Sequence, residues 1–102
     1  MLSFSAHQRY FLLSKAVDMG NGFNGLSCLV RKHISHGLTS GDIFIFINKH
    51  RDKIKLLLCD NNGFAIWCKE LQKGTFRGVE LGKNTMVELV RSDWLGDALG
   101  RH

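Results

Sequence analysis

The residues best suited to binding chemistry are basic side chains grouped between positions 49 and 77 of this 102-residue chain. Seven Lys or Arg residues lie there against three Asp or Glu, so the segment carries +4 of the chain's net charge of +5. Such side chains bind phosphate oxygens, and these contacts position a protein on nucleic acid without reading its sequence. An alternative is a charged sheet edge that blocks strand-to-strand aggregation. The candidate nucleic-acid-binding residues are Lys49, His50, Arg51, Lys53, Lys55, Lys69, Lys73 and Arg77.

Catalytic, metal and cofactor sites have less support in the spacing. The segment Gly20 to Gly25 matches G-x-G-x-x-G, but the strand candidate that follows does not end in the acidic residue that would hold a ribose. His33 and His36 could contact one metal ion, yet no nearby Cys, Asp or Glu completes a set of ligands. The acidic residues are scattered singly, which does not favour a two-metal nuclease site. We therefore expect a protein that is not an enzyme and uses no cofactor or metal.

The cysteines and the hydropathy indicate a cellular compartment. Cys28, Cys59 and Cys68 form no C-x-x-C pair, and their odd number leaves one thiol unpaired in a monomer. A reducing cytoplasm fits this pattern best. The first residues do not resemble a signal peptide, and no apolar run approaches the length of a membrane span. We expect a soluble cytoplasmic protein without a membrane partner, with its strand cysteines inert in the packing.

The basic group lies on a predicted antiparallel meander over residues 42–73, whose first turn, 48–52, is rich in positive charge. The run from Ile43 to Ile47 is apolar at every position, which is typical of a central strand. The run 53–59 alternates Lys with apolar residues and leads to Asn62-Gly63, a strong hairpin signal. With those two as loop residues, Leu58 faces Trp67, Ile54 faces Leu71 and Lys55 faces Glu70.

Other segments complete a single domain over residues 1–102. The run 9–13 is a short apolar strand candidate, and apolar residues at helical spacing predict a helix over 22–36. A loop is expected over 75–84 and a C-terminal helix over 86–99. The predicted fold is therefore α+β, with a small sheet of three to four strands packed against these helices.

An ordered set of segments resembles a known family, the accessory TnpB protein of IS66-type bacterial insertion sequences. This family is distinct from the RNA-guided nucleases that share the TnpB name. The segments lie between residues 2 and 77. They are Val17-Asp18-Met19, Phe23-Asn24-Gly25-Leu26 with Leu29-Val30, Ile43-Phe44-Ile45-Phe46 with Asn48-Lys49-His50-Arg51-Asp52-Lys53-Ile54-Lys55, Asp60-x-x-Gly63-Phe64, and Lys73-Gly74-x-Phe76-Arg77.

The resemblance implies a small non-catalytic protein that is encoded beside a separate DDE transposase and needed for transposition. The DNA ends of the element and the transposase are its implied partners. The chain departs from the family at Gly20-Asn21, where basic residues are usual, and at Gly78-Val79, where Trp-Pro is usual. We expect a family-like part over 2–77, a divergent tail over 78–102 and weak DNA binding through the basic hairpin. The alternative is an adaptor that docks on the transposase without contacting DNA.

Overall fold

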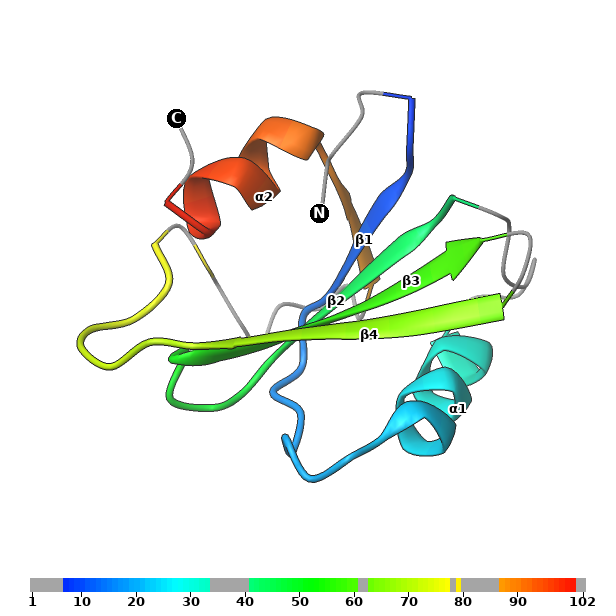
Figure 1. Ribbon diagram of the computed structural model, residues 1–102, viewed down its shortest axis with the longest axis horizontal. Helices are drawn as coiled ribbons and strands as arrows, with labels where there is room; N and C mark the ends of the chain where they lie inside the picture. Colours follow the sequence, from blue (N-terminus) through cyan, green and yellow to red (C-terminus); the bar gives the residue numbers. More distant parts are fainter. Residues whose placement is uncertain (1–6, 34–40, 61–62, 78, 80–86, 101–102) are drawn as a thin grey trace.

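A five-stranded sheet, in the order β4-β3-β2-β1-β5, forms the middle layer of the protein, with one helix on each face (Figure 1). The computed structural model describes residues 7–33, 41–60, 63–77, 79 and 87–100. The predicted α+β class is confirmed, and the sheet has five strands rather than three to four. The elements are β1 (Tyr10–Leu13), α1 (Phe23–His33), β2 (Ile43–Ile47), β3 (Lys53–Asp60), β4 (Gly63–Glu70), β5 (Val87–Val90) and α2 (Ser92–Ala98).

The strand β2 is central in the sheet, as its continuous apolar sequence predicts. All five of its residues are buried, because a helix covers each face of the sheet and a strand lies on each side. It pairs antiparallel with β3, and β3 pairs antiparallel with β4, which confirms the meander. On its other side β2 pairs parallel with β1, and the chain between these two strands contains α1. The helix predicted over 22–36 is confirmed for 23–33, and residues 34–36 lie outside the described part.

The β3–β4 hairpin is paired two residues away from the predicted register. Asp60 pairs with Gly63, so residues 61 and 62 separate the strands, and Gly63 already belongs to β4 with a φ of 144°. A shift of two leaves every side chain on its predicted face, so alternation alone could not separate the two registers. Leu58 faces Ala65 and not Trp67, Ile54 faces Lys69 and not Leu71, and Lys55 faces Cys68 while Glu70 faces Lys53.

The C-terminal region differs from the single helix predicted over 86–99. Val87–Val90 forms β5, which pairs antiparallel with β1, and the helix α2 occupies only 92–98. The reason is tertiary: without β5, the apolar strand β1 would leave one edge unpaired beside the core. Of the loop predicted over 75–84, the residues that the structure describes are neither helical nor extended in a ladder.

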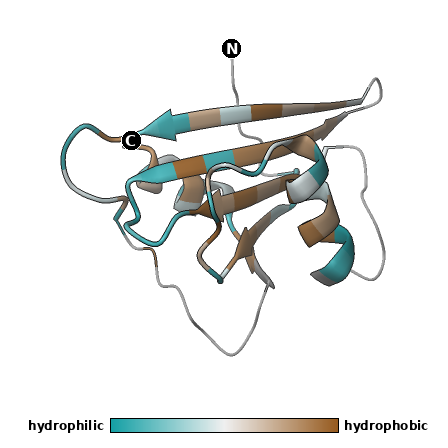
Figure 2. Cartoon of the chain, turned by 90° about the horizontal axis from the view of Figure 1, so that it is seen from below, coloured by the Kyte–Doolittle hydropathy of each residue, from teal (hydrophilic) through white to brown (hydrophobic). Residues whose placement is uncertain are grey.

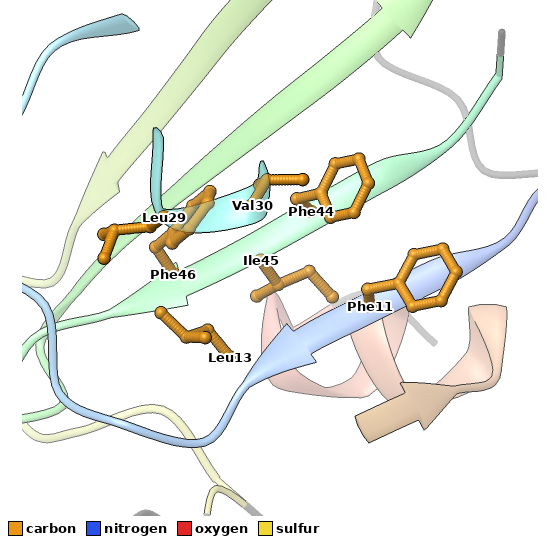
Figure 3. Close-up of a pocket in the computed structure, with 7 residues that line it drawn as sticks. All are labelled: Phe11, Leu13, Leu29, Val30, Phe44, Ile45 and Phe46. Carbon is orange, nitrogen blue, oxygen red and sulfur yellow. The ribbon is translucent and has the colours of Figure 1, made fainter. Parts of the chain in front are cut away.

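Two apolar cores lie on the two faces of the sheet. On one face, β2 and β3 pack against Leu95 and Leu99 at the C-terminal helix. On the other face, Leu26 and Val30 of α1 pack against the same two strands. Figure 3 shows the residues around a space between α1 and the strands β1 and β2, which measures about 10 Å³ and could hold at most one water. The helix α1 therefore completes a filled core.

An ion pair joins the starts of the parallel strands β1 and β2. Arg9 donates from Nε to Asp42 Oδ1 at 2.9 Å and from Nη2 to Asp42 Oδ2 at 2.7 Å. The Asp42 side chain is buried, with 3% of its surface exposed. The Ile43 amide also donates to the Arg9 carbonyl at 2.9 Å. The two strands are thus held in register where they begin.

Candidate nucleic-acid interface

The strand directions bring basic residues to one end of the sheet. Because β1 and β2 are parallel, and β3 is antiparallel to both β2 and β4, the strands β1, β2 and β4 all end on the same side. The segments that follow them are 14–22, the turn 48–52 and the segment 71–77. The last two lie beside each other at the left of Figure 1 and are largely hydrophilic in Figure 2. We call these three segments together the basic end, and its exposed basic residues are Lys15, Lys49, His50, Arg51, Lys73 and Arg77.

Hydrogen bonds from one asparagine shape the turn 48–52. Asn48 Oδ1 accepts from the amides of Asp52 at 3.1 Å and Lys53 at 3.0 Å. Its Nδ2 donates to Asp52 Oδ1 at 2.6 Å, and its carbonyl accepts from the Arg51 amide at 3.1 Å. Arg51 adopts a φ of 58°, which is uncommon for a residue other than glycine. These bonds hold the turn in one shape that presents Lys49 and His50, both exposed.

Backbone bonds join this turn to the segment that follows β4. The Phe76 amide donates to the Arg51 carbonyl at 2.8 Å, and the Leu71 amide donates to the Asp52 carbonyl at 2.8 Å. The Arg51 guanidinium donates to the Val79 carbonyl at 3.3 Å. Phe76 is itself buried in the core on the α2 face. The two loops of the basic end are therefore a connected unit.

The acidic residue of the turn is held in its ionised form. The hydrogen bond from the Asn48 side chain lowers the pKa of Asp52 below its ordinary value, and electrostatic interactions with Lys53 and His50 act in the same direction. The carboxylate is directed to Asn48 within the turn. Counting Lys49, Arg51, Lys73 and Arg77 against Asp52, residues 48–52 and 71–77 carry four positive charges and one negative, a net +3 with His50 neutral.

Three of the eight predicted binding residues lie away from the tip of the turn and contact the protein itself. Lys55 Nζ donates to the carbonyls of Met19 at 2.7 Å and Asn21 at 2.8 Å. Lys53 Nζ lies 3.4 Å from Glu70 Oε1 across the hairpin. Lys69 lies on the face of the sheet opposite to Lys53 and Lys55, where its Nζ donates to the Leu99 carbonyl at 3.3 Å. The structure brings the other five together at the basic end.

Lys15 is a basic residue of this end that a window over 49–77 does not contain. It follows β1, and the amide of Val17 donates to the carbonyl of Ile47 at 3.0 Å, so this segment runs beside the end of β2. If β1 and β2 had been predicted to pair in parallel, Lys15 would have been expected at the same end of the sheet as the turn 48–52. The segment and the turn together line a cleft, formed by Ala16, Val17, Asp18, Met19, Asn48, Lys49, His50 and Lys53.

Comparison with known proteins places the chain in a family. Residues 8–99 match the family described as IS66 Orf2 like protein. The chain belongs to the IS66 Orf2-like family. It is also 32% identical, over 76 residues, to the uncharacterized protein y4jC of Sinorhizobium fredii. That alignment covers 74% of this chain and 65% of the relative, so the chain spans less than two thirds of the protein it matches. No solved structure matches the chain.

The IS66 Orf2-like match covers all the strands and helices described above, from β1 to α2. It continues beyond residue 77, where the resemblance seen in the sequence ends. Of the helices in the described ranges, none has both the length and the apolar character needed to cross a membrane.

The remaining candidate motifs lie apart from the basic end or serve the fold of this IS66 Orf2-like chain. The strand after the G-x-G-x-x-G segment is parallel to β1, as a dinucleotide-binding fold requires. The acidic residue beside that strand, Asp42, lies at its start and is bound to Arg9, so it does not serve as the ribose ligand. Across residues 7–33, 41–60, 63–77, 79 and 87–100, no three His, Cys, Asp or Glu side chains gather as a metal site, and His36 lies outside these ranges. None of the three cysteines, all within the described ranges, forms a disulfide. Cys59 is buried as expected, whereas the expectation is wrong for Cys68, which is exposed on the edge strand β4. Cys28 is exposed on α1.

Proposed function

We propose that this protein is a non-catalytic accessory factor of insertion-sequence transposition that binds the DNA backbone through the basic end. Membership of the IS66 Orf2-like family supports the connection to insertion sequences. The observation that carries the DNA-binding part is the convergence of two cationic loops, 48–52 and 71–77, which share backbone hydrogen bonds. Because backbone hydrogen bonds already hold the two loops together, four Lys or Arg side chains can contact phosphates without the loop backbones first losing much conformational freedom.

Contacts of this kind are strongly dependent on salt. Each phosphate that a cation neutralises releases a counterion, so the logarithm of the binding constant falls with the logarithm of salt concentration by about 0.9 per contact. The number of contacts can therefore be measured as a slope, and residues that make contacts can be separated from residues that only contribute to net charge.

The test uses the full chain and a short DNA duplex of arbitrary sequence. The double variant Lys49→Gln with Lys73→Gln removes one exposed charge from each loop of the basic end. We expect the magnitude of the salt slope to fall by about 1.8, since two contacts are lost. Affinity measured by fluorescence anisotropy over a series of salt concentrations gives this slope directly.

The matched control is Arg31→Gln with Arg91→Gln, which removes the same charge from exposed residues of α1 and the segment before α2. We expect this variant to keep the slope of the unmodified chain. Equal slopes for both variants, or no measurable binding by the unmodified chain, would contradict the proposal. In that case the adaptor alternative is tested by co-purification with the element's transposase after nuclease treatment.

A further inference from the structure

The outer edge of β4 is unusual for the border of a sheet. The strand is eight residues long, and the sequence from Gly63 to Cys68 contains no charge and no proline. Exposed edges usually carry such residues, or are short or bulged, because an unpaired ladder can pair with another chain. Phe64 at this edge is 47% exposed, although it also contacts Phe23 of α1. Figure 2 shows β4 as the outermost strand, coloured apolar along much of its length.

The pairing to β3 decides which backbone groups face outward. The Leu71 amide donates to the Asp52 carbonyl, and the same pairing continues along the hairpin to Asp60 and Gly63. Since hydrogen-bonded positions alternate along an antiparallel strand, the odd-numbered residues of β4 bond to β3. The amides and carbonyls of Phe64, Ile66, Cys68 and Glu70 therefore point away from the sheet.

We propose that this edge binds the same edge of a second copy, so that two sheets join through antiparallel β4 strands around a two-fold axis. Such an axis stands perpendicular to the sheet, so a residue must pair with one on the same face. With Ile66 on the axis, it faces Ile66 of the second copy, and Phe64 faces Cys68. On the opposite face, Ala65 lies opposite Trp67, so a small side chain leaves room for a large one.

Charge argues against registers centred nearer the C-terminal end of β4. With the axis at Ile66, no two like charges among residues 63–70 lie opposite each other. An axis at Lys69 or Glu70 would place like charges directly opposite, which is destabilising. An axis at Trp67 would place Phe64 opposite Glu70, whose carboxylate pairs with Lys53. The uncharged residues 63–68 surround the proposed axis at Ile66, so the pairs next to the axis contain no charged side chain.

The other edge of the sheet is a poorer candidate. The strand β5 has four residues, half the length of β4, and so offers half as many outward backbone positions. It nevertheless carries Leu89, which is 65% exposed. Leu89 therefore serves as a control for the effect of an exposed apolar side chain on an edge.

The first experiment measures the mass of the full chain by sedimentation equilibrium in a reducing buffer, over a range of concentrations up to about 1 mM. A pair of eight-residue strands makes an interface below the standard size, so we expect a dimer that dissociates in the micromolar range. A monomer at every concentration would overturn the proposal.

The matched variants are Cys68→Glu on β4 and Leu89→Glu on β5. Residue 68 is exposed and lies beside Lys55 of the same chain, so the carboxylate is compatible with the folded monomer. It would, however, face Phe64 of the second copy. We expect Cys68→Glu to weaken the dimer at least about tenfold and Leu89→Glu to leave it unchanged. A dimer equally stable in both variants would show that the interface lies elsewhere.

Disulfide formation tests the register. In a chain with Cys28→Ser, the variant Phe64→Cys would place its thiol opposite Cys68 of the second copy, at a Cα separation of about 5.5 Å. We expect a covalent dimer on oxidation. The control adds Cys68→Ser, which should remain uncross-linked because residues 64 of the two copies are then about 14 Å apart along the strands. Cross-linking in both variants, or in neither, would contradict this register.

Discussion

The two ends of the central sheet use their charges in opposite ways. Where β1 and β2 begin, Arg9 binds Asp42 through two hydrogen bonds, and the carboxylate is almost fully buried. Where these strands end, Lys49 and His50 are exposed at the tip of a turn whose shape is fixed by Asn48. The first end uses charge to align two strands. The second presents Lys49 and His50 to the solvent on a turn whose shape comes mainly from the hydrogen bonds of Asn48.

The two ends show that neighbouring charges in the sequence can have different roles, one stabilising the fold and the other facing the solvent. Lys49 and Lys55 lie six positions apart in one basic cluster, yet Lys55 binds two carbonyls of the segment before α1. A hydrogen bond from a charged group to a partly buried carbonyl contributes more to stability than an exposed cation does. The contrast between the ends can therefore be measured as a contrast in stability.

The largest effect is expected at the start of the parallel strands. The substitution Arg9→Gln removes the charged partner of a buried carboxylate, and breaking such a pair is far more costly than losing a surface charge. We expect the melting temperature to fall by about 15 °C. Circular dichroism during heating measures it.

Lys49→Gln is the control for that measurement, because it also removes one positive charge. We expect its melting temperature to stay within about 2 °C of the unmodified protein. Similar losses in both variants would mean that net charge, rather than the buried pair, determines the effect.

An intermediate effect is expected for Lys55, which belongs to the predicted binding cluster but contacts the fold. Lys55→Met keeps most of the side chain's apolar length and removes the donor to Met19 and Asn21. We expect a loss of about 1–2 kcal/mol in the free energy of unfolding, measured with denaturant. Lys49→Met, made as the equivalent change at the exposed turn, should lose less than about 0.5 kcal/mol. If Lys55→Met leaves the stability unchanged, the bonds of Lys55 to Met19 and Asn21 do not stabilise the fold, and Lys55 again becomes a candidate for binding DNA.

Local patterns predicted those parts of the fold that local sequence determines. Ile43 to Ile47 is apolar on both faces and is the central strand, and the meander follows from it. The strand Val87–Val90 was missed because its partner, β1, lies over 70 positions earlier in the chain. The hairpin register failed for another reason. Asn62-Gly63 is a favourable loop pair, but a loop one position earlier keeps all side chains on the same faces.

The sequence predicted a basic turn, but it did not show which basic residues of the chain lie at this end of the sheet. The sequence identified Lys49, His50 and Arg51 as the residues of a turn, and the structure places them there. It could not show that Lys69 reaches the Leu99 carbonyl, because that contact spans 30 positions. Lys15 was missed for the same reason, since only the parallel pairing of β1 with β2 brings it to this end.

The smallest effect concerns the acidic residue of the turn, and it appears as a dependence on pH. The pKa of Asp52 is lowered in the folded protein, chiefly by the Asn48 side chain. Its stabilising contribution is therefore complete above the ordinary value of 3.8 and is lost as the pH falls through the lower folded value. Asp52→Asn retains an oxygen that can accept the Asn48 bond but cannot titrate. We expect the unmodified protein to be more stable than this variant at pH 6, and the gap to close towards pH 3. Denaturant unfolding at both pH values measures this difference in the free energy of unfolding. The other carboxylates titrate alike in both proteins, so their contributions largely cancel in the difference. A gap that stays constant would show that the charge of Asp52 does not hold the turn, which would leave Asn48 and its backbone bonds as the source of its shape.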